Sequence, residues 1–177
     1  NKINTNTYKT ISKEKQLDEL IKKLDEKSVI AVDTETSSLN PQEADLVGVS
    51  LCHETNEAFY IPVGHKEKTE LKKDVVLRKL KPILEDPSIK KVGQNIKYDF
   101  IIFKNHGIEL SSVEDTMLLS YTLDAGNNRH NMDTLSELHL GHKTISYKDL
   151  VGTGKKQLNF ADVDIKPATE YAAEDAD

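Results

Sequence analysis

The chain has 177 residues, of which 30 are acidic and 24 are Lys or Arg, so its formal net charge is −6. This balance argues against a histone-like or polycationic nucleic-acid binder, but it leaves open an enzyme that acts on nucleic acid. Hydrophobic residues make up 37%, which suits a single globular domain with a real core. The single cysteine, Cys52, excludes an internal disulfide, and no apolar stretch approaches the roughly 20 residues that span a bilayer.

The first half of the sequence predicts one helix followed by a group of strands. Apolar residues at helical spacing predict a helix over 12–28. The uninterrupted apolar run 29–32 predicts a strand that is covered on both faces. Two further strands are expected over 45–54 and 57–63, and the short polar turn between them predicts an antiparallel hairpin.

The second half alternates helices with short strands, which predicts an α/β domain with a mixed sheet. The segment 146–163 is polar, bears Gly and Lys, and is typical of a connection. The expected elements are a helix over 73–87, a strand over 89–93, a helix over 95–107, a strand that becomes a helix over 113–124, and helices over 131–141 and 166–177.

Two carboxylates, Asp33 and Glu35, end the apolar strand that begins at Val29. Residues i and i+2 of a strand lie on the same face, so these side chains emerge side by side. Their mutual repulsion would raise the pKa of one of them, and a divalent cation would remove that penalty. The alternative is that both residues only cap a turn before 37–41, and the strand alone does not decide between a metal site and a turn.

Two helices each offer an acidic residue one turn after a polar one. Asn95 and Asp99 stand at i and i+4, and so do Tyr171 and Asp175. Either pair in isolation is more often a solvated helix face. Because both pairs follow the Asp33 and Glu35 motif in the same chain, the combination is more specific than any single part.

The motifs "DTET", "NIKYD" and "YAAED", in this order, resemble the DEDD superfamily of 3′–5′ exonucleases in its Tyr-bearing branch. The similarity extends to "VGQNIKYD", "NHGIEL", "DTMLLSYTLD", "RHNMDTLSE" and "HKTISYKDLVGTGKKQLNF", which look like the proofreading domain of bacterial DNA polymerase I, a family A polymerase. It covers most of the chain from about Val29 onward and is weaker within 1–28 and 64–75.

The resemblance implies an RNase H-like fold with a five-stranded mixed sheet flanked by helices. It also implies a catalytic set of Asp33, Glu35, Asp99, Tyr171 and Asp175. In that set Asp33 contacts two metal ions, Glu35 and Asp175 complete the first metal site, and Asp99 holds the second through water. Tyr171 orients the attacking water.

The chemistry of phosphodiester hydrolysis fits these residue types. Two divalent ions roughly 3.5–4 Å apart can align a nucleophile with the leaving 3′ oxygen and offset the developing charge. Mg²⁺ and Mn²⁺ prefer oxygen ligands, which carboxylates supply. With an ordinary pKa of about 10, tyrosine is a poor general base at neutral pH, so Tyr171 is assigned to positioning. No histidine ligand is expected in the active site, because the six histidines are dispersed and none is expected to have the i and i+4 pairing with an acid that is typical of a zinc site.

Substrate contacts are expected from residues that match family positions, although each could also be ordinary packing or a solvated side chain. Leu39 and Phe160 are expected to wedge against the terminal bases of an unpaired strand. The other expected contacts, to the strand backbone, the terminal nucleotide or a phosphate, come from Thr36, Gln94, Asn95, Tyr98 and Arg129.

The function expected from the sequence is a Mg²⁺- or Mn²⁺-dependent 3′–5′ exonuclease that cuts single-stranded DNA to 5′-nucleotides. The chain is expected to be one domain, residues 1–177, of a longer polymerase. Its partners would be the 3′ end of single-stranded DNA and the polymerase domain of the same parent chain, in a bacterial cytoplasm and not at a membrane. A stand-alone RNA-trimming exonuclease like RNase D, and a non-catalytic scaffold, remain open.

Overall fold

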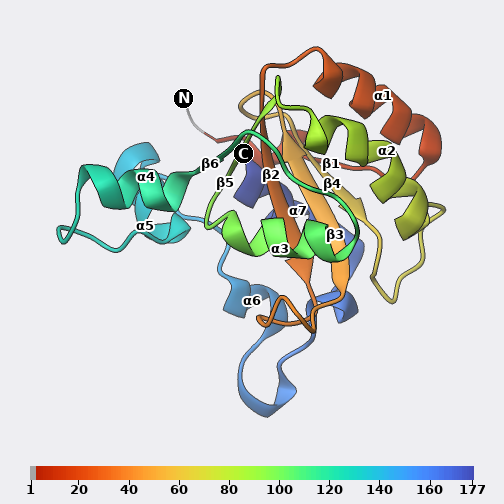
Figure 1. The fold of residues 1–177 in the computed structure, drawn as a ribbon. Helices are drawn as coiled ribbons and strands as arrows, with labels where there is room; N and C mark the ends of the chain where they lie inside the picture. Colours follow the sequence, from red (N-terminus) through yellow and green to blue (C-terminus); the bar gives the residue numbers. More distant parts are fainter. Residues whose placement is uncertain (1–2) are drawn as a thin grey trace.

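The computed structural model describes residues 3–177, apart from the side chain of Lys155, and is built around one six-stranded sheet (Figure 1). Across the sheet the strand order is β1-β4-β3-β2-β5-β6. The strands are β1 (Lys9–Thr10), β2 (Val29–Thr36), β3 (Leu46–Cys52), β4 (Ala58–Pro62), β5 (Lys90–Gly93) and β6 (Val113–Asp115).

Seven α-helices and three short 3₁₀ turns are found among these residues. The helices are α1 (Glu14–Asp25), α2 (Lys73–Glu85), α3 (Lys97–Asn105), α4 (Thr116–Leu123), α5 (Met132–Leu140), α6 (Tyr147–Val151) and α7 (Ile165–Ala176). The 3₁₀ turns are η1 (Thr5–Thr7), η2 (Gly154–Lys156) and η3 (Phe160–Asp162). None of the helices within residues 3–177 combines the length and the apolar character that crossing a bilayer requires.

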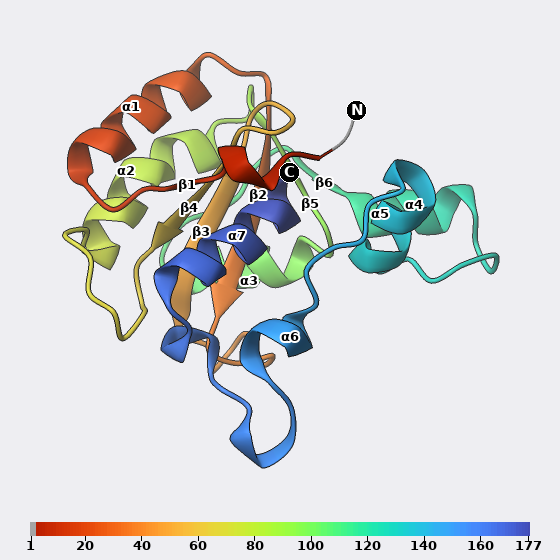
Figure 2. The same ribbon diagram turned by 180° about the vertical axis from the view of Figure 1, so that it is seen from behind.

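The sheet is mixed, and helices cover both of its faces. β3 pairs antiparallel with β2 and with β4, whereas β5 runs parallel to β2 and to β6. Helices α1, α2 and α3 lie on one face (Figure 1), and α7 crosses the other (Figure 2). The larger apolar core lies under the first three helices and a smaller one lies under α7.

The side chains of β2 point alternately to the two faces of the sheet, and this alternation determines which residues lie on each face. Ile30 and Val32 belong to the core on the side of α1, α2 and α3, while Ala31 packs with alanines of α7. Continuing the alternation puts Asp33 and Glu35 on the α7 side. Thr34, which lies between them in the sequence, faces α3.

Two residues of the sheet, Gly48 and Lys91, are tightly enclosed by their neighbours. Gly48 on β3 leaves no room for a side chain, because an added Cβ would lie 2.1 Å from the hydroxyl oxygen of Tyr60. Lys91 on β5 is fully buried, and its ammonium group donates to the carbonyls of Asp86 and Ile89 at 2.6 Å each. The lysine therefore satisfies backbone carbonyls in the segment that follows α2.

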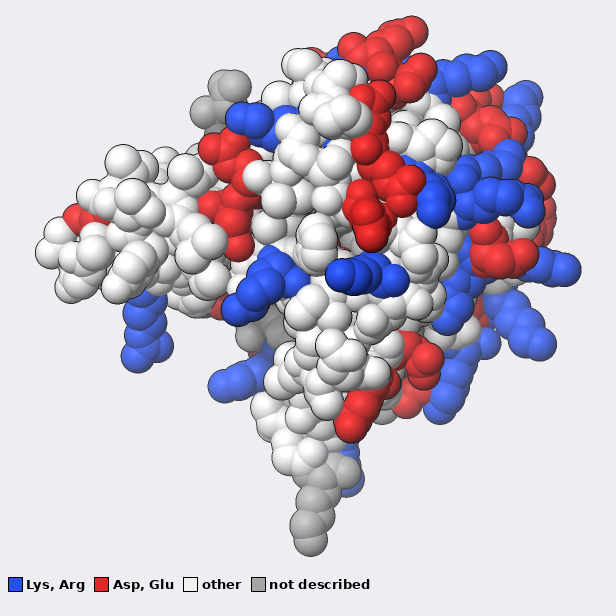
Figure 3. All heavy atoms as spheres, viewed as in Figure 1, with Lys and Arg blue, Asp and Glu red and all other residues white. Residues whose placement is uncertain are grey.

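Helices α4 and α5 form a lobe that projects from the sheet (Figures 1 and 2). No residue of α4 is buried, and Ser136 is the one buried residue of α5. In Figure 3 this lobe presents a mostly uncharged surface, while charged side chains of both signs are interspersed over the region of α1 and α2. The lobe thus contributes little to the core.

The predicted α/β architecture is confirmed, with two differences. The hairpin of β3 and β4 and the change from strand to helix at Asp115 are as expected. The sheet has six strands and not five, because the two residues of β1 pair with β4 at one edge. The expected connection 146–163 contains α6 and two 3₁₀ turns, which are too short to give a helical period.

Candidate active site

Three carboxylates from two elements converge at the C-terminal end of β2. Asp33 and Glu35 come from the strand, and Asp175 comes from α7, which packs on the same face of the sheet. One oxygen from each of the three lies within 4.8 Å of the others. The register of β2 shifts between Glu35 and Thr36, so the regular ladder ends where the acidic side chains gather.

Asp99 approaches the same place from the opposite layer. It lies in the first turn of α3, is 3% exposed, and its Oδ1 accepts hydrogen bonds from the backbone N–H and the hydroxyl of Thr34 at 2.9 and 2.5 Å. Asp99 is close enough to raise the pKa of Asp33 through charge repulsion. Thr34 therefore fixes the fourth carboxylate beside the other three. The four residues Asp33, Glu35, Asp99 and Asp175 are called the acidic centre below.

Burial and mutual repulsion disfavour four negative charges in the acidic centre. Burial is the main cause that raises the pKa of Asp99 to about 6 and that of Asp175 to about 7. The pKa values of Asp33 and Glu35 are raised well above their usual range by burial and by the neighbouring carboxylates.

The acids of this centre are not ion-paired with any cationic side chain that the structure describes. The donor atoms are all carboxylate oxygens, which are the ligands that Mg²⁺ and Mn²⁺ prefer. The residues present therefore fit divalent cations of this kind.

Tyr171 lies one turn before Asp175 on α7 and also faces the acidic centre. Its pKa is raised far above the ordinary value by burial first, then by the charges of Asp175 and Glu35 and by a hydrogen bond with Asp175. The phenol therefore stays protonated near neutral pH. It can donate a hydrogen bond and position a water molecule, but it is a poor base.

The acidic centre opens into a cavity of about 1260 Å³. Its lining joins the end of β2 and the loop after it with the first turn of α3, with α6 and the segment that follows, and with α7. A second cavity, of about 520 Å³, lies between the lobe of α4 and α5 and the end of α7, and it also reaches Asp33 and Asp175.

The two expected wedge residues have different surroundings. Leu39 lines the large cavity and is 96% exposed, so its side chain is free to contact a ligand. Phe160 is 1% exposed and packs against the rings of Tyr147, Tyr171 and His65. Both Phe160 and Tyr147 line the cavity, and their rings are stacked at a centroid distance of 6.3 Å, with Tyr147 the more exposed of the two at 39%. Base contact by Leu39 or Phe160 stays a prediction.

Thr36 and Tyr98 lie together at the cavity wall. Their hydroxyl oxygens form a hydrogen bond at 2.5 Å, and both lie within hydrogen-bond distance of the carbonyl of Ser38, which accepts from the hydroxyl whose proton is not used between them. The loop that carries Leu39 is therefore tied to α3, the helix that carries Asp99.

Gln94 and Asn95 form a brace between β5 and the lobe of α4 and α5. The Gln94 amide donates to the carbonyl of His130 at 2.7 Å, and the Asn95 N–H donates to Asp115 at 3.1 Å. Both residues line the large cavity. Arg129 is exposed in the loop between α4 and α5 and does not line this cavity, so the structure does not bring it to the acidic centre.

Sequence reasoning missed two residues of the site. One is Thr34, which strand alternation places on the α3 face, opposite the two acids that flank it. Tyr147 lines the large cavity and meets Tyr171 edge to face at 5.9 Å. No local signal marks Tyr147, since the single turn of α6 has no pattern of its own.

Comparisons with known proteins agree with this geometry. The family model described as "3′–5′ exonuclease" matches residues 8–177. DNA polymerase I of Pseudomonas aeruginosa is 46% identical over 96% of this chain, which spans only 19% of that protein. The chain therefore covers about a fifth of the length of such relatives.

Two solved structures share the fold. Escherichia coli RNase D matches 96% of this chain and 41% of its own with a TM-score of 0.70 and 21% identity. Brucella melitensis NrnC with bound Mg²⁺ matches 85% of this chain and 67% of its own with a TM-score of 0.63 and 24% identity. These matches confirm the RNase H-like exonuclease fold, in which the sheet here has six strands.

Proposed function

The chain belongs to the 3′–5′ exonuclease family, and we propose that it hydrolyses single-stranded DNA from the 3′ end and releases 5′-nucleotides. The observation that carries the proposal is the convergence of Asp33, Glu35 and Asp175 within 4.8 Å, with Asp99 beside them, in an open cavity. Carboxylates without a cationic neighbour, gathered at a strand end, suit phosphodiester chemistry better than they suit a stable core.

We propose that the acidic centre binds two divalent cations, Mg²⁺ or Mn²⁺, through Asp33, Glu35, Asp99 and Asp175. When bound, such ions align the attacking water and the scissile phosphate and offset the charge that develops. The presence of Mg²⁺ in the NrnC structure, which has a similar fold, supports this choice. The raised pKa values of the carboxyl groups mean that cation binding also releases protons.

The other residues of the site act by holding and orienting. Thr34 keeps Asp99 in place through two hydrogen bonds, and the protonated Tyr171, whose O–H is directed at Asp175, offers its phenolic oxygen as a hydrogen-bond partner that orients the water. Leu39 and Tyr147 offer apolar and aromatic surface on which unpaired bases can lie. In this proposal Thr36 and Tyr98 support the loop beneath the terminal nucleotide.

We infer further that the domain edits DNA as part of a longer polymerase. The support is the 46% identity to a DNA polymerase I, of which the matching region is a fifth. Shared fold alone does not favour RNA, since the RNase D match is 21% identical. A free-standing RNA-trimming enzyme therefore remains the second candidate, and the substrate test below separates the two.

The test is degradation of matched single-stranded DNA and RNA oligonucleotides, labelled at the 5′ end, with Mg²⁺ or Mn²⁺. We expect a ladder of DNA products that shortens from the 3′ end, and 5′-mononucleotides as the released species. Asp99→Asn should abolish the ladder, while Asp149→Asn, at an exposed residue of α6, should leave it unchanged. A strong preference for RNA would overturn the DNA assignment, and no hydrolysis by the folded chain with either cation would favour a non-catalytic scaffold.

A further inference from the structure

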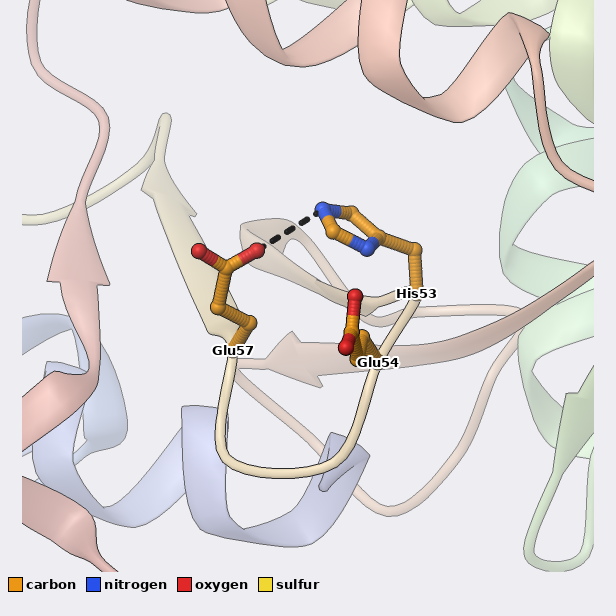
Figure 4. A group of neighbouring side chains, drawn as sticks. All are labelled: His53, Glu54 and Glu57. Atoms are coloured by element: carbon orange, nitrogen blue, oxygen red, sulfur yellow. Dashed lines mark ion pairs between the residues drawn. The ribbon is translucent and has the colours of Figure 1, made fainter.

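The turn between β3 and β4 gathers a histidine and two glutamates away from the acidic centre. His53, Glu54 and Glu57 each offer one ligand atom, and these three atoms lie within 4.8 Å of one another. In Figure 4 the imidazole of His53 points across the turn toward Glu57, and the carboxylate of Glu54 points up toward the ring. The expectation that no histidine pairs with an acid at i and i+4 is wrong here, because His53 and Glu57 have that spacing in a turn.

His53 is the feature that distinguishes this group from an ordinary cluster of surface acids. Its side chain is 3% exposed, and neither ring nitrogen has a hydrogen-bond partner among the described residues. Nε2 lies 3.3 Å from Oε2 of Glu57 without the geometry of a hydrogen bond. A buried imidazole that makes no hydrogen bond and faces carboxylates is arranged as a metal ligand is.

The charges around His53 are compatible with this role. Burial lowers its pKa, the charge of Glu57 opposes that shift, and the nearby Lys27 and Lys23 add to it. The ring is therefore neutral near pH 7, which is the form that binds metals. The ammonium of Lys23 lies 3.8 Å from Oε2 of Glu57, but its side chain is half exposed and can turn into solvent when a cation takes its place.

We propose that His53, Glu54 and Glu57 form a binding site for a divalent transition-metal ion, with Zn²⁺ preferred. One imidazole nitrogen, two carboxylate oxygens and a water molecule supply the four ligands that Zn²⁺ takes. Mg²⁺ prefers oxygen ligands alone and keeps most of its water, so it is disfavoured at this site. The two metal sites of the chain thus differ in donor chemistry.

The role of this ion is structural, because the turn holds the end of α7. The N–H of Asn56, at the tip of the turn, donates to Asp177 at 2.6 Å, and Asp177 also accepts from the hydroxyl of Tyr8 at 2.8 Å. Asp177 stands two residues after Asp175. An ion that rigidifies the turn therefore stabilises the helix end that carries one acid of the acidic centre.

The first test observes the imidazoles of the unmodified, ¹⁵N-labelled chain by NMR while ZnCl₂ is added in the presence of excess Mg²⁺. We expect one imidazole, that of His53, to show the nitrogen shift of a coordinated ring as the first equivalent binds. The acidic centre contains carboxylates only, so zinc bound there cannot give this signal. Zinc binding without any coordinated imidazole would overturn the proposal.

The second test counts bound zinc by equilibrium dialysis in the unmodified chain and in three variants. His53→Gln should lose one equivalent, and His139→Gln, at an exposed residue of α5, should keep the full number. Glu57→Gln retains the buried ring and should weaken zinc binding by about tenfold or more. This variant keeps the test decisive if His53→Gln does not fold. Equal stoichiometry and affinity in the unmodified chain and in both turn variants would refute the site.

Discussion

Replacing Asp175 by Asn should stabilise the metal-free protein at pH 8. The pKa of Asp175 is raised in the folded state, first by burial. The folded chain therefore holds the proton more tightly than the unfolded chain does. The resulting contribution to stability is complete below about pH 3.8 and is lost as the pH rises through about 7. Asn carries no charge and keeps an oxygen that can accept from Tyr171. The variant therefore does not lose stability as the pH rises through about 7.

The size of this effect follows from the same two pKa values. A rise from 3.8 to about 7 corresponds to about 4 kcal/mol at about 1.4 kcal/mol per pKa unit. Because Asp175 retains partial solvent exposure, we expect about half of this, about 2 kcal/mol, in the free energy of unfolding. For a chain of this length that is an increase in Tm of about 4–8 °C.

The assay is thermal unfolding in EDTA at pH 8 and at pH 4.5, repeated with Mn²⁺. The variant should melt higher than the unmodified chain at pH 8, and the difference should shrink at pH 4.5, where the folded chain already holds its protons. Mn²⁺ should raise the Tm of the unmodified chain more than that of the variant. A variant that melts lower than the unmodified chain at pH 8 in EDTA would refute the electrostatic reasoning.

Three further changes test other parts of the structure. Thr34→Val should lower the hydrolysis rate about tenfold and the Tm by about 2–8 °C, because Asp99 loses a hydrogen bond of about 1–2 kcal/mol. Single-turnover kinetics would measure the rate, and an unchanged rate would contradict this role of Thr34. Lys91→Met should cost about 2–5 kcal/mol in urea unfolding, since two buried carbonyls lose their donor, whereas Lys90→Met at the surface should cost under about 1. Gly48→Ala should lower the free energy of unfolding by about 3 kcal/mol or more, because the ring of Tyr60 beside it is fully buried and has no room to move. A free energy of unfolding equal to that of the unmodified chain would exclude that clash.

Much of the acidic centre could be predicted because its signals are local. An apolar run followed by acids at i and i+2 predicts side chains on one face of a strand end, and helical spacing predicts Tyr171 beside Asp175. That these segments meet in space is not local information. It entered through the resemblance of the motifs to a known family, and the structure places Asp175 within reach of Asp33 and Glu35.

The features that the sequence did not reveal depend on tertiary packing. "KK" at 90–91 gives no hint that Lys91 is fully buried while Lys90 pairs with Glu114 at the surface. Phe160 lies in a polar stretch that is typical of a loop, yet its ring is enclosed by three other rings. The edge strand β1 has two residues, too few for any alternation to be detected.

Crystals of the chain soaked with Mn²⁺ and a short DNA strand would test most directly whether the four acids share a pair of ions. The anomalous difference map should contain two peaks, one among Asp33, Glu35 and Asp175 and one between Asp33 and Asp99, with the terminal phosphate across both. Density for DNA elsewhere, or a map without manganese at Asp33, would contradict the account.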